Sequence, residues 1–259
     1  MNTRLDYNPA FSRSRWVGYF DLLGTRELIR SGDHFRVFSV YETAVGEVIR
    51  WNSRLTGIQH AWFSDTFLIY SEDDTASDFV AMDSICRWFV HFLILARIPV
   101  RGAVACGDFY ADAGNRVYLG QALLDAYEFG EAQDWIGFLL CPSAIMRLDE
   151  VGLPASEQLN YSYAEVPIKK MMSTNRLAAC VLGEWAKING ENQVVVALRQ
   201  MKARQLDGEI ARKYQNSITF IERHGRHLSQ GNQPGAAPKS DPDTQLGSSG
   251  VMMGPASLS

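Results

Sequence analysis

The fold is decided by the stretch Trp16-Val17-Gly18-Tyr19-Phe20-Asp21-Leu22-Leu23-Gly24-Thr25. It has the pattern of a short apolar strand bounded by turn residues, except that an acid lies near its end. A buried carboxylate must be paired, hydrogen-bonded or bound to a metal, because a bare buried charge is costly. The corner at Gly24 and Thr25 favours an anion such as phosphate, since backbone N–H groups point outward at a helix start. An aspartate at a strand end is also an ordinary turn residue, so this stretch alone leaves both interpretations open.

A second stretch, residues 59–70, strengthens the interpretation of Asp21 as a functional residue. It consists of two apolar runs separated by Ser64-Asp65-Thr66, which predicts a β-hairpin with an acid at its tip. Two carboxylates, each presented at a strand end, are typical of a site for a hard divalent cation. The sequence therefore pairs Asp21 with Asp65 as candidate metal ligands.

Composition limits the class of protein. A chain of 259 residues with 46% hydrophobic residues can bury a proper core, as one large domain or one domain with additions. The net charge of −4 argues against a general nucleic-acid binder, which usually carries a basic excess. The most apolar run, residues 88–98, is too short to span a bilayer.

The four cysteines stand singly in apolar segments, without a Cys-x-x-Cys motif: Cys86, Cys106, Cys141 and Cys180. This pattern predicts buried thiols in a reducing compartment and neither a disulfide framework nor a zinc site. The N-terminus has no apolar segment of the kind that a signal peptide needs. We therefore expect a cytoplasmic protein without a membrane anchor.

Hydrophobic spacing predicts a strand, a helix, a hairpin, a second helix and a strand, in that order. This is the skeleton of a ferredoxin-like split βαβ sheet, an α/β fold for which helices are expected on one face. The predicted ranges are a strand from 16, a helix over 35–49, the hairpin over 59–70, a helix over 77–97, a strand over 100–110, a short strand or turn over 115–118, a helix over 120–129, a strand over 135–140, a short helix over 144–148, and a strand pair over 161–172 and 176–185.

The chain is predicted to have four parts. Residues 1–15 form an irregular arm, residues 16–190 the main domain, and residues 191–228 a basic helical extension. The last part, residues 229–259, is rich in Gly, Pro and Ser and has no aromatic residue. Such a tail cannot bury enough apolar area to become ordered.

Three motifs together resemble those of the class III nucleotidyl cyclases, over residues 15–185. The segment from Phe20 to Gly24 resembles the motif that carries the first metal-binding aspartate. Phe63-Ser64-Asp65 resembles the hairpin tip that carries the second. The run Arg101-Gly102-Ala103-Val104-Ala105-Cys106-Gly107 resembles the strand whose arginine contacts the terminal phosphates.

The resemblance has consistent departures. Purine cyclases have a base-reading lysine four residues before the second aspartate, where this chain has Ala61. They also have an asparagine and an arginine that act in the transition state, at positions matched here by Leu124 and Glu128. One branch of the family, the pyrimidine cyclases of the bacterial anti-phage system called Pycsar, is similar in this altered pattern and in length.

The resemblance implies a homodimer, with sites at the interface, that cyclises UTP, or alternatively CTP, to a 3′,5′-cyclic nucleotide. It further implies a separate effector protein that senses this product. Asp21 and Asp65 would hold two Mn²⁺ or Mg²⁺ ions, with Leu22 as a further metal ligand. Arg101 would complete the catalytic set.

Substrate contacts are implied at the strand-to-helix corner. There the resemblance places Phe20, Leu23, Gly24 and Thr25 around the nucleotide, and Arg101 on its terminal phosphates. Two other classes stay open. One is a degenerate cyclase-homology module that binds a nucleotide or a partner without turnover. The other is a relative of polymerase palms or diguanylate cyclases, although that would require a different hairpin tip.

Overall fold

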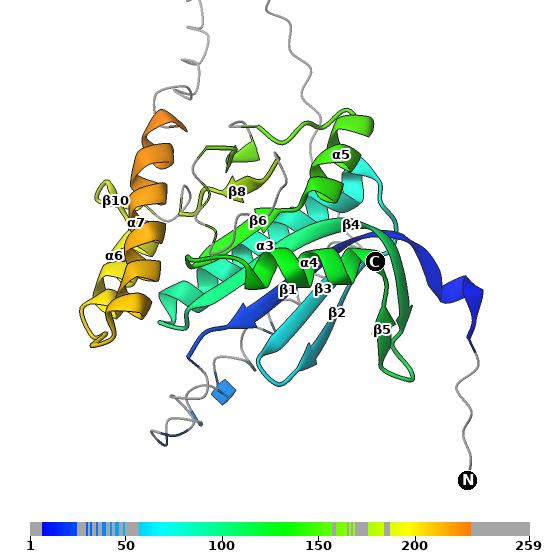
Figure 1. Ribbon diagram of the computed structural model, residues 1–259, viewed down its shortest axis with the longest axis horizontal. Helices are drawn as coiled ribbons and strands as arrows, with labels where there is room; N and C mark the ends of the chain where they lie inside the picture. The colour runs from blue at the N-terminus through cyan, green and yellow to red at the C-terminus, as the bar shows by residue number, and fades with distance from the viewer. Residues whose placement is uncertain are drawn as a thin grey trace, which may run out of the picture.

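In the computed structural model of the chain, residues 7–24, 57–156, 159–164, 176–183 and 187–228 are described, with a few single residues between them. Figure 1 shows a mixed sheet in the middle, with α4 in front of it and α6 and α7 at one end. The elements are η1 (Pro9–Phe11), β1 (Ser12–Leu22), β2 (Ile58–Phe63), β3 (Thr66–Ser71), α3 (Ala76–Leu95), β4 (Val100–Asp112), β5 (Val117–Leu119), α4 (Gln121–Glu131), β6 (Gly137–Leu140), α5 (Pro142–Glu150), β7 (Tyr161–Ser162), β8 (Ala178–Cys180), β9 (Lys187–Ile188), β10 (Glu191–Asn192), α6 (Gln193–Lys202) and α7 (Gly208–Leu228).

The strand order confirms the predicted α/β fold with a mixed sheet. Its neighbours run β2-β3-β1-β4-β6-β8-β7, and β5 pairs with β4. The first four of these are antiparallel and reproduce the split βαβ skeleton. Beyond β4 the sheet continues through β6, which is parallel to β4, so the described strands make a larger sheet than that skeleton alone.

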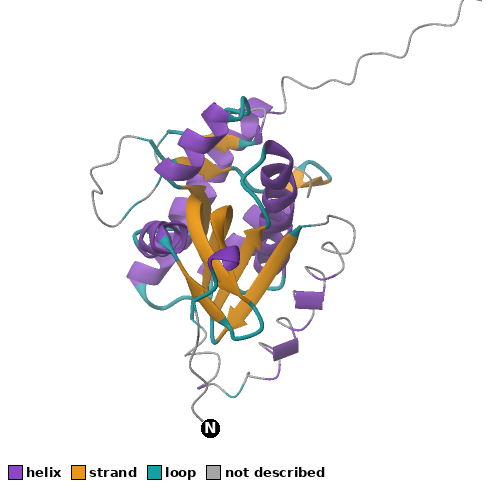
Figure 2. Ribbon diagram, turned by 90° about the vertical axis from the view of Figure 1, so that its right-hand side faces the viewer, coloured by secondary structure: helices purple, strands orange, loops and turns teal. Residues whose placement is uncertain are grey.

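The expectation that helices cover only one face of the sheet is wrong. Adjacent residues of β1 point to opposite faces: Phe20 packs on Phe89 of α3, and Tyr19 packs edge-on against Tyr127 of α4. Figure 2 shows the strands between helices on both sides. The physical reason is the crossover from β4 to β6, whose helix α4 must cover the face that α3 leaves open.

The predicted start of the first strand at Trp16 is also wrong, by four residues. β1 begins at Ser12, and its first residues pair with the far end of β4, Ser12 with Tyr110. The polar arm becomes a strand because β4, which ends at Asp112, is long enough to pair with it. The final strand pair exists but is shorter than expected, since β7 has two residues and β8 three. Within the helix predicted over 35–49, the residues that the structure describes (35, 38, 39, 42, 45, 46 and 49) are helical, and the tail over 229–259 lies outside the described residues.

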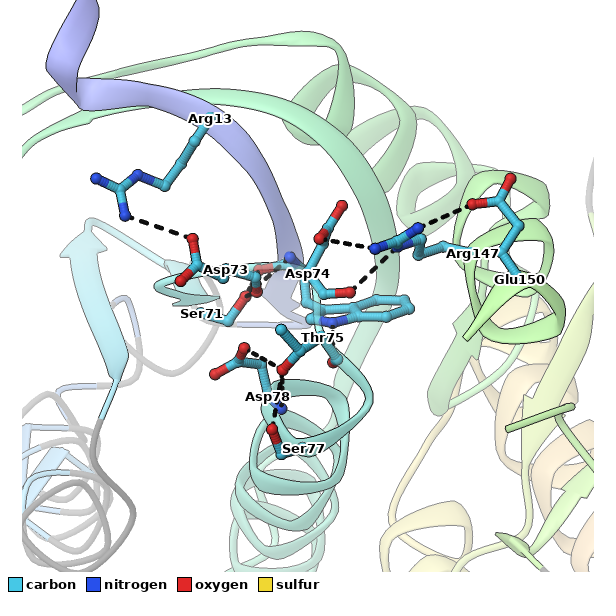
Figure 3. Close-up of polar contacts among 10 residues, drawn as sticks. Arg13, Ser71, Asp73, Asp74, Thr75, Ser77, Asp78, Arg147 and Glu150 are labelled. Atoms are coloured by element: carbon cyan, nitrogen blue, oxygen red, sulfur yellow. Dashed lines mark hydrogen bonds and ion pairs between the residues drawn. The ribbon is translucent and has the colours of Figure 1, made fainter. Parts of the chain in front are cut away.

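The connection from β3 to α3 is a well-defined helix start, shown in Figure 3. Thr75 is the N-cap, and its hydroxyl accepts a hydrogen bond from the Asp78 N–H at 3.2 Å. Arg147 of α5 donates to the Asp74 carboxylate at 3.0 Å, which ties this corner to the helix that follows β6. These contacts fix where α3 begins, one residue before the predicted position.

The basic helical segment packs into the core. Phe220 of α7 lies edge-on against Trp135, with ring centroids 4.9 Å apart. The Ile136 N–H donates to the Ser217 hydroxyl at 2.7 Å, and Val194 of α6 is fully buried. The two helices are therefore part of the same hydrophobic core as the sheet.

The four cysteines are free and buried, as the sequence predicted. Burial raises the pKa of the Cys86 and Cys141 thiols well above the ordinary value, so both stay protonated at neutral pH. Within the part of the chain that the structure describes, no helix has the length and apolar character needed to cross a membrane.

Candidate active site

Asp21 lies near the end of β1, in the middle of the sheet. In register it is flanked by Thr66 on β3 and by Arg101 on β4. Its side chain points to the α4 face, because Tyr19, two residues earlier, contacts α4. The position is fixed by pairing on both sides of the strand, which is the support that a precisely placed ligand needs.

Asp65 lies in the two-residue turn between β2 and β3, as predicted. Phe63 pairs with Thr66 across this turn, and Ser64 adopts a positive φ of 56° that allows it to close. The Asp65 carbonyl oxygen accepts a hydrogen bond from the Leu22 N–H at 3.0 Å. The structure thus places the hairpin tip directly beside the end of β1, and the two predicted acids share one end of the sheet.

Arg101 forms an ion pair with Asp21. Its Nε and Nη2 both donate to Asp21 Oδ2, at 3.1 and 3.0 Å. Its Nη1 donates to the Glu131 backbone carbonyl at 3.1 Å, and its Nη2 also bonds the Glu131 carboxylate. Gly102 follows on β4, where a Cβ would overlap the Phe20 ring. Arg101 is therefore held between two carboxylates.

Glu131 is the site residue that sequence reasoning missed. It is the last residue of α4, and the parallel pairing of Arg101 with Gly137 brings the chain after α4 back beside β4. The predicted order strand, helix, strand over residues 100–140 indicates that the chain comes back to the sheet after the helix. It does not say which residue of the returning chain meets Arg101.

Burial dominates the electrostatics of the site. The Arg101 and Asp21 side chains are only 9% and 16% exposed, whereas Glu131 is 37% exposed. Burial raises the pKa of the Asp21 carboxyl although Arg101 acts in the opposite direction. Burial likewise raises the pKa of Tyr19 to about 12, against a hydrogen bond with Thr66. A metal cation bound beside Asp21 would lower the free-energy cost of burying the Asp21 carboxylate.

The donor set suits an oxygen-preferring divalent cation. Asp21 and Asp65 supply carboxylates at one sheet end, the backbone of Leu22 lies between them, and Glu131 adds a third acid nearby. Among the described residues, no three His, Cys, Asp or Glu side chains converge into a ready-made metal centre. A cation at Asp21 would take over the neutralising role that Arg101 has in this structure.

The strand-to-helix corner differs from its predicted role in one respect. The Leu22 N–H donates to Asp65 and the Leu23 N–H donates to the Pro99 carbonyl at 2.8 Å, so neither points free toward a ligand. The next backbone N–H group along the chain belongs to Gly24, which has a positive φ of 75°. The Phe20 side chain is fully buried in the core, and Thr25 lies outside the described residues.

A groove with a cavity volume of about 830 Å³ adjoins Asp21 on the α4 face of the sheet. Tyr19 and Thr66, the neighbours of Asp21 on that face, line it. Of the three positions that depart from the purine-cyclase pattern, Ala61 and Leu124 line the same groove. Glu128 is exposed one turn further along α4. Two of the departing positions therefore lie on the wall of the groove that adjoins Asp21.

The aromatic residues of the hairpin are divided between the two faces. Trp62 stacks on Phe67, with ring planes 7° apart, and its indole N–H donates to the Ser64 carbonyl at 2.6 Å. Phe63 is 83% exposed beside the groove, and Tyr127 lies across from it on α4. The groove is apolar and aromatic, which suits the stacking of a flat ring.

No family model and no curated protein matches this sequence. Among solved structures, the chain is similar to an adenylyl cyclase, CyaB from P. aeruginosa, with a TM-score of 0.47, 13% identity, and 65% of this chain and 93% of that chain covered. It is similar to a guanylyl cyclase domain of the RhoGC fusion protein from Blastocladiella emersonii, with a TM-score of 0.49, 10% identity and coverage of 64% and 92%. It is also similar to adenylate cyclases from Trypanosoma brucei, with a TM-score of 0.46, 14% identity and coverage of 70% and 92%. All three are named as purine nucleotide cyclases.

Proposed function

We propose that this protein is a nucleotidyl cyclase that converts UTP to 3′,5′-cyclic UMP and pyrophosphate. The observation that carries the proposal is the meeting of Asp21 and Asp65 at one sheet end, beside a groove of about 830 Å³. Cyclisation needs little covalent help from a protein, because positioning and charge neutralisation account for most phosphoryl-transfer catalysis. The site offers both.

In the reaction, the 3′-oxygen of the nucleotide attacks the α-phosphorus, and the bond from that phosphorus to the β-phosphate oxygen breaks. The 3′-hydroxyl loses its proton, and pyrophosphate leaves. Two divalent cations held by Asp21 and Asp65 would lower the pKa of the hydroxyl and neutralise the leaving oxygens. Arg101 would keep Asp21 ionised and oriented, since it already donates to that carboxylate.

The preference for a pyrimidine is argued from the groove. Ala61 lies where a lysine reads the purine edge in the resembling family, and it leaves no donor at that point of the wall. Phe63 and Tyr127 line the groove with aromatic side chains, on which a single pyrimidine ring can stack. The choice of UTP over CTP rests on the resemblance to Pycsar cyclases. So do the proposed cytoplasmic role in anti-phage signalling and the separate effector that binds the product.

The second candidate is a nucleotide-binding module without turnover. It is favoured by Leu124 and Glu128, which stand where the resembling enzymes have transition-state groups. Both side chains are exposed on α4. Retention of Asp21, Asp65 and Arg101 in one cluster favours the enzyme.

The deciding experiment offers the four nucleoside triphosphates at equal concentration with Mn²⁺, and measures pyrophosphate release and the cyclic products by mass spectrometry. We expect cyclic UMP to dominate. Dominant cyclic AMP or GMP would refute the pyrimidine proposal, and dominant cyclic CMP would refute only the choice of UTP. Nucleotide binding without any pyrophosphate release would establish the second candidate.

The exposed apolar face around the groove is expected to bind a second copy of the chain in a head-to-tail homodimer. Phe63, Leu124 and Tyr127 are 83%, 54% and 47% exposed, more than a solitary chain usually leaves together. A twofold partner would cover this face and add polar groups to the groove.

Sedimentation velocity checks this prediction. The wild-type chain should sediment as a dimer, and Phe63→Asp with Leu124→Asp should be monomeric without a large change in melting temperature. Val80→Asp is the matched control, because Val80 is 51% exposed on α3, on the opposite side of the sheet. A fully active wild-type monomer would contradict the dimer.

A further inference from the structure

We propose that α7, the long C-terminal helix, is a positioning element for the site: it clamps the connection between α4 and β6, and this connection holds the Arg101 guanidinium against Asp21. The α4–β6 connection consists of residues 132–136, between the end of α4 at Glu131 and the start of β6 at Gly137. In Figure 1, α7 stands at the end of the sheet at which β6 begins. The expected effect on rate rests on the proposed function, whereas the geometry is tested without activity.

One side of the connection holds Arg101 and its strand. The Glu131 carbonyl and carboxylate, at the start of the connection, both accept from the guanidinium. Two residues further on, the Gln133 side-chain amide donates to the Gly102 carbonyl at 2.7 Å, directly after Arg101 on β4. The Gln133 side chain is fully buried, and its amide oxygen accepts from the Trp135 indole N–H. Gln133 therefore fixes the connection against the strand that carries Arg101.

The other side of the connection is bonded to α7. Asn216 donates its side-chain amide to the Asp134 carbonyl at 2.8 Å, and Arg212 forms an ion pair with the Asp134 carboxylate at 3.0 Å. The Ile136 N–H donates to the Ser217 hydroxyl, which is fully buried. Hydrogen bonds from α7 thus anchor the backbone of the connection at two positions, two residues apart.

Packing of aromatic rings adds to these polar contacts. The Trp135 ring, which is fully buried, lies edge-on against Phe220 of α7. The contacts come from a single face of α7, because positions four, five and eight residues apart lie together on a helix. The residues of this face are Arg212, Asn216, Ser217 and Phe220. One helix face therefore fits one short connection.

The geometry of Arg101 depends on this clamp. Strand pairing fixes only the backbone of Arg101, because its side chain is long and flexible. The carboxylates of Asp21 and Glu131 hold the guanidinium, and the position of Glu131 depends on the end of α4. A close-packed interior transmits the displacement of one segment to the next. A shift of α7 would therefore displace the connection, loosen the Glu131 contact and weaken the bond from Arg101 to Asp21.

The test follows the exchange of the Arg101 Nε–H proton with water, by nuclear magnetic resonance of the isotope-labelled full chain. This proton is donated to Asp21 at 3.1 Å, so that it exchanges when the contact opens. The Arg87 Nε–H proton, which is donated to Asp83 at 2.7 Å on α3, is the internal reference for global unfolding. The variants Arg101→Lys and Arg87→Lys identify the two resonances by their absence.

The double variant Asn216→Ala with Ser217→Ala removes two hydrogen bonds between α7 and the connection. Its Arg101 proton should exchange at least about tenfold faster than in the wild type, the effect of losing two hydrogen bonds of ordinary strength. Its Arg87 proton should exchange at the wild-type rate. If the double variant does not fold, Asn216→Ala alone should give a smaller acceleration in the same direction.

The matched control is the double variant Gln215→Ala with Glu222→Ala. It removes two polar side chains of α7 that bond Lys202 and Arg199 of α6 and not the connection. Both reference and site protons should exchange in this control as they do in the wild type. Circular dichroism melts of the two double variants show whether each is folded.

Kinetics separate this inference from the proposed function. If the protein cyclises UTP, the variant at Asn216 and Ser217 should lower kcat by about tenfold or more, because small misplacements of catalytic groups are costly, and the control should not. Equal Arg101 exchange in the two double variants, or equal acceleration of the Arg87 and Arg101 protons, would overturn the inference and leave the cyclase proposal intact. A selective acceleration at Arg101, in a chain that cyclises no nucleotide, would refute the proposed function and keep the role of α7.

Discussion

Replacing Asp21 or Asp65 with asparagine is expected to lower cyclic nucleotide formation by about 10²–10³-fold or more, the size of a lost transition-state interaction. Asparagine keeps the shape of the side chain but loses the charge that a divalent cation needs. Both acids lie at strand ends and not inside the hydrophobic core, so the folded state should survive the change. Initial rates of pyrophosphate release measure the effect, and Mn²⁺ titration followed by electron paramagnetic resonance measures ion binding directly.

Asp108→Asn provides the matched control. Asp108 is an exposed acid at the other end of the same strand pair, opposite Ser14, and it should leave both rate and ion binding unchanged. Undiminished activity in either purified site variant would rule out the two-metal mechanism. A loss of activity with unchanged Mn²⁺ binding would assign the two acids to some role other than holding the ion.

Replacing Arg101 with methionine is expected to lower the free energy of unfolding by about 3 kcal/mol, the cost of breaking a buried ion pair from one side. Methionine fills a similar volume but leaves Asp21 buried without a cation, with its carboxylate only 16% exposed. The double variant Arg101→Met with Asp21→Asn should recover part of this loss, because it removes the unpaired charge. Urea unfolding of the two single variants and the double variant gives the coupling between the two residues.

Arg13→Met is the control for a lost charge at the surface. Arg13 pairs with Glu72 and Asp73, but all three side chains are 40% exposed or more, so the change should cost less than about 1 kcal/mol. An Arg101 variant as stable as the Arg13 variant would show that the buried pair with Asp21 contributes nothing to folding.

Local patterns predicted the local structure well. The hairpin formed at Ser64 and Asp65 because a two-residue turn fixes the strand register by itself. The helix after it was predicted over 77–97 and runs over Ala76–Leu95, since Thr75 supplies a cap and Pro99 follows its end. The alternating spacing of apolar residues in a strand and their helical spacing in a helix depend only on residues close together in the chain. Both can therefore be identified from one sequence.

Long-range contacts were predicted less well, for a physical reason. The strand-end pattern paired Asp21 with Asp65, but Arg101 joined them only through a family resemblance, and the sequence did not reveal that Arg101 bonds Asp21 directly. Glu131 was missed because its meeting with Arg101 depends on how α4 crosses the sheet. Likewise, the helices on both faces and the early start of β1 follow from the length and crossover of β4, which no local window contains.

The hairpin tip gives the site one fixed and one adjustable carboxylate. Asp21 is built into the central strand of the sheet, whereas Asp65 sits on a hairpin whose outer strand β2 is the last in the order. Thr66 pairs with Asp21 in the ladder between β1 and β3, and beyond this pair the Leu22 N–H donates to the Asp65 carbonyl. Opening that bond would change the spacing between the two acids without disturbing the core, since strands at a sheet edge fluctuate at lower cost than central ones. In the proposed two-cation site, the hairpin would therefore set the spacing between the cations, and product release would proceed by fraying at this tip while the rest of the sheet stays paired.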